Sequence, residues 1–205
     1  GQQARISTEV RGLRSELRDN VTATLSLTRA GDTPVSRERL EDLLGRAPRE
    51  VRTALEPFGF YDAVVQDSVA QRGDRWAVTL TVQPGDPVIV TSADVRVEGP
   101  GAEDPALAEA LQRASALLGQ ALSHREYEAL KRSLATTASS RGYLDAVFDS
   151  SVVRVNRTNR TADIVVLLAS GPRYRLGPVT FIQDVLDPLL LQRLVPWEPG
   201  AAYHG

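Results

Sequence analysis

The sequence repeats itself at a constant spacing, and this repeat constrains the fold more than any other feature. Gly59 to Val64 has the sequence G-F-Y-D-A-V, and Gly142 to Val147, 83 residues later, has the sequence G-Y-L-D-A-V. The alternating apolar run from Trp76 to Val82 returns 86 residues later, from Ala162 to Leu168. The three additional residues fall between two strand-like runs, where a hairpin loop tolerates insertion. The sequence therefore predicts two related units of about 85 residues each, within the usual range of domain sizes.

Periodicity predicts the order strand, helix, helix, strand, strand within each unit. Strict alternation from Trp76 to Val82 is typical of a strand with one buried face, and the Val-rich stretch before it completes a β-hairpin. Apolar residues at helical spacing between Leu40 and Phe58 predict a long amphipathic helix before the hairpin. Gly45 and Pro48 interrupt this helix, and proline removes a backbone hydrogen bond, so we expect a kink or two short helices there.

The second unit carries clearer helix signals than the first. Ser123 to Glu126 forms a capping box that opens a helix extending to about Arg141. Asp104 is suited to cap the shorter helix before it, with Pro105 at the first helical position. In the first unit, the corresponding shorter helix is expected over an apolar stripe that includes Leu13, Leu17, Val21 and Leu25. Each unit opens with a short strand that ends in glycine, at Gly12 and at Gly99.

A third unit starts near the end of the sequence. A strand is expected at Pro178–Phe181 and a helix at Asp187–Val195, and Gly200 to Tyr203 aligns with Gly119 to Leu122. A half-unit cannot close its own core, so we expect the protein to continue beyond this chain. The predicted domains are residues 1–87, residues 88–172, and an incomplete third unit at 173–205.

Composition excludes several classes of function. Lys and Arg total 24 against 26 Asp and Glu, so the chain lacks the basic excess of a nucleic-acid-binding protein. There is no cysteine and there are only two histidines, which excludes a cysteine nucleophile and a Cys/His zinc site. Only Lys131 among the basic residues is lysine. The longest apolar run, Ile164 to Ala169, is far shorter than the roughly 20 residues of a membrane-spanning helix. We therefore expect a non-enzymatic protein without cofactor or metal.

The repeated βααββ order with Gly-aromatic-x-Asp after the second helix resembles the POTRA (polypeptide-transport-associated) domain family. Three longer stretches resemble the TamA branch of this family, whose members are outer-membrane subunits of the translocation and assembly module, more than its insertase relatives. The first consists of Gly119–Ser123, Tyr127–Lys131 and Arg141–Asp145, and the other two are Ser170–Gly177 and Leu194–Gly200. The interruption at Gly45 and Pro48 departs from this pattern.

The resemblance implies an α+β fold of tandem POTRA domains, in which two antiparallel helices cover one face of a three-stranded mixed sheet. It also implies a periplasmic scaffold that assists secretion and assembly of autotransporters or other outer-membrane clients. The implied partners are an inner-membrane-anchored TamB-like protein, unfolded clients, and a C-terminal outer-membrane barrel outside this chain. Nucleic acid is not among them.

The second strand of each unit is the candidate binding site, because the family topology places it at a sheet edge. An edge strand has unpaired amide and carbonyl groups to which an extended client segment can add. The candidate edge residues are Val64, Val65, Gln66, Val69, Val147, Phe148, Asp149 and Val152. The repeated motif residues Gly59, Tyr61, Asp62, Gly142, Tyr143 and Asp145 are expected to be structural. The glycines end helices, Phe60 and Tyr143 begin the following strands, and the aspartates bind turn amides.

Three alternatives remain open from the sequence. A two-partner secretion exporter shares POTRA units, but it typically has two of them, whereas a third begins here at Pro178. A free periplasmic peptide-binding module has no barrel. A hydrolase ranks last, because no set of nucleophile, base and orienting residue is evident. Arg154, Arg157 and Arg160 cluster around the second hairpin loop. They could bind an acidic partner or lipid headgroups, but the nearly neutral overall charge favours the interpretation that they belong to a solvated loop.

Overall fold

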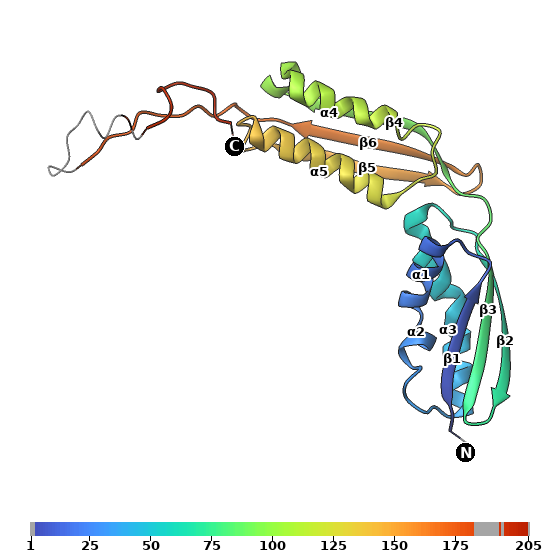
Figure 1. Cartoon of the computed structure of the whole chain (residues 1–205). Coiled ribbons are helices and arrows are strands. Elements are labelled where there is room, and N and C mark those ends of the chain that lie inside the picture. The colour runs from blue at the N-terminus through green and yellow to red at the C-terminus, as the bar shows by residue number, and fades with distance from the viewer. Residues whose placement is uncertain (1–2, 183–192, 194, 205) are drawn as a thin grey trace. The chain divides into compact units, whose positions relative to one another are not determined.

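The computed structural model describes residues 3–182, 193 and 195–204, and within it the chain forms two compact units. Unit 1 comprises residues 1–91 together with 119–125 and 155–162, and unit 2 comprises residues 92–118, 126–154 and 163–205. Each unit is centred on one three-stranded sheet (Figure 1).

The first sheet has the strand order β1-β3-β2, with β1 at Arg5–Arg11, β2 at Val64–Arg72 and β3 at Arg75–Gln83. The first strand is parallel to β3, whereas β2 is antiparallel to it, so the sheet is mixed. Alternation along β3 buries Trp76, Val78, Leu80 and Val82, as the sequence pattern predicts. Each fully buried Leu or Val of such a set contributes about 1.5–3 kcal/mol by leaving water.

Helices cover one face of the first sheet (Figure 1). They are α1 at Ser15–Thr24, α2 at Ser26–Arg29, α3 at Arg37–Leu55 and the 3₁₀ turn η1 at Glu56–Phe58. The Asn20 side chain of α1 donates a 2.7 Å hydrogen bond to the carbonyl of Ala54 in α3, which joins the two longer helices. The shorter helix predicted over Leu13 to Leu25 corresponds to α1, and α2 follows it after Leu25, whose backbone is extended.

The second sheet repeats this order as β4-β6-β5, confirming the predicted α+β class with mixed sheets. Its elements are β4 at Ile89–Glu98, η2 at Pro100–Glu103, α4 at Pro105–Ser115, α5 at His124–Ser140, β5 at Val147–Asn156 and β6 at Thr161–Ala169. Asp104 caps α4 by accepting a hydrogen bond from the amide of Ala106, as predicted. Along β6, Ile164, Val166 and Leu168 are buried, like their counterparts in β3.

The division of the long helix into two short helices, one of the two expected outcomes, is wrong. The helix α3 is continuous from Arg37 to Leu55 and contains Pro48 in its interior. Its apolar stripe is buried along the whole length, with Leu40, Ala47 and Val51 all in the core. Packing of this stripe outweighs the loss of one backbone hydrogen bond at the proline, because most helix stability in proteins comes from tertiary contacts.

Two further strand predictions are also wrong. Phe60 and Tyr143 do not begin strands: both lie in the buried connections that precede β2 and β5, which start four residues later at Val64 and Val147. Pro178–Phe181 forms no strand and is exposed. The helix expected at Asp187–Val195 falls almost entirely outside the described residues.

The chain leaving each repeat forms the same short bridge. In unit 1, Ile89 pairs with Ala121, the amide of Val90 binds the Gln120 carbonyl at 2.9 Å, and that of Gly119 binds the Val90 carbonyl at 2.8 Å. In unit 2, Arg175 pairs with Ala202, and the two matching bonds are Leu176 to Ala201 at 2.9 Å and Gly200 to Leu176 at 2.8 Å. The aligned segments Gly119–Leu122 and Gly200–Tyr203 thus have the same backbone pairing.

Candidate functional site

The two candidate binding strands, β2 and β5, both lie at sheet edges. Each pairs with the central strand of its sheet on one side, and among the described strands it has no neighbour on the other. The hairpin register of unit 1 places Val65, Asp67 and Val69 opposite the buried residues Val82, Leu80 and Val78. Directly opposed residues share a face, so these three face the helices, and Val64, Gln66 and Ser68 face the open side.

Apolar side chains are exposed at matching positions of the two edges. The exposed fractions are 52% for Val64 and 40% for Val69, and 56% and 40% for their counterparts Val147 and Val152, at the same offset of 83. Gln66 and Asp149 are exposed between them, whereas Val65 and Phe148 are half-buried. The structure therefore brings the eight predicted edge residues onto two equivalent strands, four on each.

The opposite edges, β1 and β4, carry ion pairs instead of exposed valines. The Arg11 guanidinium donates hydrogen bonds of 2.9 and 2.8 Å to Glu9, and Arg96 binds Asp94 in the same two-pronged way. These hydrogen bonds lower the pKa of both carboxyl groups below their ordinary values. Charged side chains discourage strand addition at an edge, so the less charged edges β2 and β5 are better suited to accept a partner.

A helix flanks each candidate edge on the covered side. In unit 1, Arg52 of α3 donates a 3.0 Å hydrogen bond to the carbonyl of Ala63, immediately before β2. In unit 2, Lys131 of α5 reaches β5, with its Nζ 5.6 Å from the centre of the Phe148 ring and 5.2 Å from that of Tyr127. An added strand would therefore pass beside a helix as well as beside the sheet edge.

The repeated glycines end helices in the left-handed conformation, as predicted, with φ of 84° at Gly59 and 92° at Gly142. They also allow close approach of another segment. A Cβ atom on Gly59 would lie 2.7 Å from the carbonyl oxygen of Leu122, and one on Gly142 would lie 3.2 Å from that of Tyr203. Both neighbours belong to the repeated bridge, which the sequence motif did not reveal.

The other motif residues have different surroundings in the two units. The guanidinium carbon of Arg157 lies 5.0 Å from the centre of the Tyr61 ring. Burial, followed by the charge of Glu56, raises the pKa of the Tyr61 phenol. Asp145 accepts a 2.8 Å hydrogen bond from the Tyr174 hydroxyl, not from the expected turn amide. Asp62 is exposed. Two of the hairpin arginines form ion pairs within unit 1, Arg157 with Glu56 and Arg160 with Asp86.

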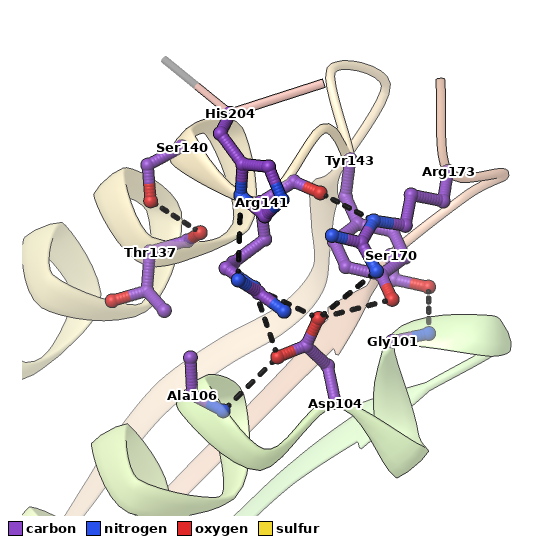
Figure 2. A network of polar contacts seen from close by, with 10 residues as sticks. All are labelled: Gly101, Asp104, Ala106, Thr137, Ser140, Arg141, Tyr143, Ser170, Arg173 and His204. Carbon is purple, nitrogen blue, oxygen red and sulfur yellow. Dashed lines mark hydrogen bonds and ion pairs between the residues drawn. The ribbon is translucent and has the colours of Figure 1, made fainter. Parts of the chain in front are cut away.

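A buried polar network in unit 2 was missed by the sequence analysis (Figure 2). The Asp104 side chain, only 2% exposed, accepts hydrogen bonds of 3.1 and 3.2 Å from Arg141 and lies 3.9 Å from Arg173. Arg173 donates a 2.8 Å hydrogen bond to the Arg141 carbonyl, and the Tyr143 hydroxyl points to Asp104 at 3.4 Å. The network joins the start of α4, the end of α5 and the segment after β6.

Burial and the charges within this network have opposing effects on the pKa of Asp104. Burial raises the pKa of Asp104, but hydrogen bonds from the Ala106 amide and from Arg141, together with the charges of Arg141 and Arg173, hold it below its ordinary value. Burial, followed by the charge of Asp104, raises the pKa of the Tyr143 phenol. Asp104 is therefore a carboxylate and Tyr143 a neutral donor at neutral pH, which suits a structural role.

Within the described residues there is no group of three or more His, Asp or Glu side chains placed to hold a metal ion. The same part of the chain contains no helix long and apolar enough to cross a membrane. The fold and its exposed edges define a class of protein: tandem α+β repeats whose accessible feature is an unpaired strand.

A protein-family model matches the first repeat. Residues 7–84 match the family model described as "POTRA domain TamA domain 1". The first repeat is therefore similar to a POTRA domain over these residues, and the second repeat has the same strand order.

Solved structures that are similar to the chain include POTRA arrays. The crystal structure of Haemophilus influenzae BamA POTRA3-5 is 18% identical, with a TM-score of 0.47, and the match covers 98% of this chain and 80% of that one. POTRA1-3 of the periplasmic domain of Omp85 from Anabaena is 19% identical, with a TM-score of 0.38 and coverage of 98% and 78%. No conclusion about function or partners is drawn from these similarities.

Proposed function

We propose that the chain is a non-enzymatic periplasmic scaffold whose edge strands β2 and β5 accept extended segments of client proteins by β-augmentation. The supporting observation is the repetition of exposed valines, Val64 with Val69 and Val147 with Val152, on two otherwise unpaired edges. Exposed apolar side chains on an edge strand are normally avoided, because they invite pairing with other chains. Their presence twice, at equivalent positions, is the pattern expected of a surface kept for strand addition.

The finer proposal is that this scaffold belongs to a TamA-like outer-membrane protein of a Gram-negative bacterium. Support comes from the TamA description of the model that matches residues 7–84 and from the TamA-like stretches of the second repeat. The protein would then carry a C-terminal outer-membrane barrel, dock a TamB-like partner, and assist autotransporter or outer-membrane protein assembly.

The proposed domain boundaries are 1–87, 88–172 and 173–205, with the last segment beginning a third POTRA domain. The repeated bridge supports this division, since Arg175 and Ala202 pair as Ile89 and Ala121 do.

Site-specific photo-crosslinking in the native cell envelope tests the function. A photoreactive amino acid is placed at Val64, Val69, Val147 or Val152 of the full-length protein, and at Glu9 or Asp94 of the opposite edges as matched controls. Crosslinks to newly secreted outer-membrane proteins or to a large envelope partner should form from the valine positions and not from the controls. Equal crosslinking from both edges, or none from β2 and β5, would overturn the proposal.

The outer-membrane assignment has its own test. An antibody against this chain should detect a large outer-membrane band whose gel mobility changes between unheated and boiled samples, because folded outer-membrane barrels are heat-modifiable. A band in the periplasmic fraction near the mass of this chain would instead favour a free peptide-binding module.

A further inference from the structure

The only lysine of the chain lies beside the β5 edge. Lys131 belongs to α5, its side chain is 21% exposed, and its Nζ is within 6 Å of the ring centres of Tyr127 and Phe148. Phe148 is the second residue of β5, so the Lys131 side chain reaches from α5 to the edge strand. An amine held against two aromatic rings is partly desolvated, and it interacts more strongly with an opposite charge than a fully hydrated one.

The protein itself only partly satisfies this charge. Glu128, one turn earlier on α5, approaches Nζ to 3.4 Å and is about half exposed. Such a pair between neighbouring turns of a helix is worth only about 0.3–0.5 kcal/mol. Glu128 is also exposed enough to rotate into water, so a second carboxylate could take its place beside Lys131.

The first repeat has no equivalent charge at this position. At the repeat offset of 83, Tyr127, Lys131 and Phe148 correspond to Leu44, Pro48 and Val65, all apolar. These three are half-buried, and Leu44 and Val65 pack against the core of unit 1. The two edges therefore share exposed valines and free backbone groups but differ in the chemistry of the flanking helix.

We propose that the β5 edge selects extended segments that carry an aspartate or glutamate side chain facing α5, and that Lys131 binds this carboxylate. Alternate residues of an added strand, about 4.8 Å outside β5, would point to the same face as Phe148 and so pass beside Lys131. The β2 edge has Pro48 at the equivalent position, and its flanking Arg52 is already bound to the Ala63 carbonyl, so this edge would accept segments without this preference. This inference rests on the proposed β-augmentation and adds the chemistry of the client.

The test uses the full 205-residue chain with isotope-labelled amides and defined peptides. The probes are a short peptide of alternating threonine and valine with one central glutamate, its glutamine twin, and a version N-methylated at alternate residues. Titration followed by NMR reports binding at the β2 and β5 amides separately. The β5 amides should respond to the glutamate peptide at about three- to fivefold lower concentration than to its twin, a preference that shrinks in high salt.

Two variants link the preference to Lys131. Lys131→Gln keeps most of the side-chain stem and should abolish the discrimination at β5, while Pro48→Lys should create it at β2. A glutamate preference that survives in Lys131→Gln, or equal binding of both peptides to the original β5 edge, overturns the inference but leaves β-augmentation intact. If neither peptide shifts the β2 or β5 amides, or if the N-methylated peptide binds equally well, both the inference and the proposed function fail.

Discussion

The two repeats share one backbone hydrogen bond at the point where the chain leaves each sheet, but different side chains surround it. In both, an amide after the last strand binds the carbonyl of the repeated glycine: Val88 to Gly59 at 2.8 Å and Tyr174 to Gly142 at 2.7 Å. In unit 2 this point is surrounded by the network of Asp104, Arg141, Tyr143 and Arg173. The repeat offsets place Phe58, Phe60 and Pro87 at the positions of Arg141, Tyr143 and Arg173. Arg14 corresponds to Asp104, because each is the N-cap of the first helix of its unit.

The comparison separates what the fold requires from what one repeat has added. The glycine and its backbone hydrogen bond occur in both units, so they belong to the common geometry. The ion network occurs only in unit 2. In unit 1, Phe60 lies in the core and Phe58 packs against it. Buried ion pairs are often no more stabilising than apolar residues of the same volume, but removing one member is costly. A substitution of the repeated glycine should therefore damage the unit that contains it, in either repeat, whereas substitutions in the network should damage only unit 2.

The largest effect is expected for Gly59→Ala. A non-glycine residue at a φ of 84° costs about 1–2 kcal/mol, and the new methyl group would lie 2.7 Å from the Leu122 carbonyl oxygen. The total loss in unit 1 should be about 2–4 kcal/mol, seen as an earlier urea-induced change in the fluorescence of Trp76. Gly142→Ala, whose nearest contacts are 3.1 to 3.3 Å, should cost unit 2 only about 1–2 kcal/mol. A larger loss from Gly142→Ala would contradict the contact argument.

For these glycines, the sequence alone predicts the position at a helix end but not the neighbouring segment. The repeat, the helix periodicity and the alternating strands are local patterns, so they predicted the element order and placed both glycines at helix ends. The reason for the missing side chain is a segment about 60 residues away, at Leu122 or Tyr203, which no local pattern contains. The network is similar: the capping role of Asp104 is local and was predicted, whereas Arg141 and Arg173 reach it only through the fold.

Asp104→Ala should produce the next largest effect, confined to unit 2. The substitution removes the cap of α4 and leaves two half-buried arginines without their carboxylate, at a cost of about 2–3 kcal/mol. Amide hydrogen exchange at core residues such as Leu134 and Ile164 should accelerate by about 30- to 150-fold. The matched control is Arg14→Ala at the corresponding, exposed position of unit 1, which should change stability by less than about 0.5 kcal/mol.

The urea transition reported by Trp76 is the second control for Asp104→Ala. It should not move, because Trp76 lies in the first sheet. Equal destabilisation of both units would show that the network supports more than the repeat that contains it.

Pro48→Ala should stabilise unit 1 by a smaller amount. Proline within a helix costs about 3 kcal/mol relative to alanine, partly offset because proline also restricts the unfolded chain. Since α3 is continuous through Pro48, alanine can supply the missing hydrogen-bond donor within the existing helix, and we expect a gain of about 1–2 kcal/mol in the Trp76 transition. No gain would indicate that the helix in solution is kinked at Pro48, as the sequence alone suggests.

The smallest expected effect is a difference in acid sensitivity between the units. Folding lowers the pKa of Asp104, so the folded unit 2 binds this proton less readily than the unfolded chain does. The stabilisation is complete above the unfolded pKa of about 3.9 and is lost as the pH falls through the lower folded value. Each unit also has one exposed carboxyl group with a lowered pKa, Glu9 or Asp94, so these contributions largely cancel in the comparison. Hydrogen exchange in unit 2 should therefore accelerate more than in unit 1 below about pH 4. Asp104→Asn should remove this difference, and a difference that persists in the variant would assign it to other groups.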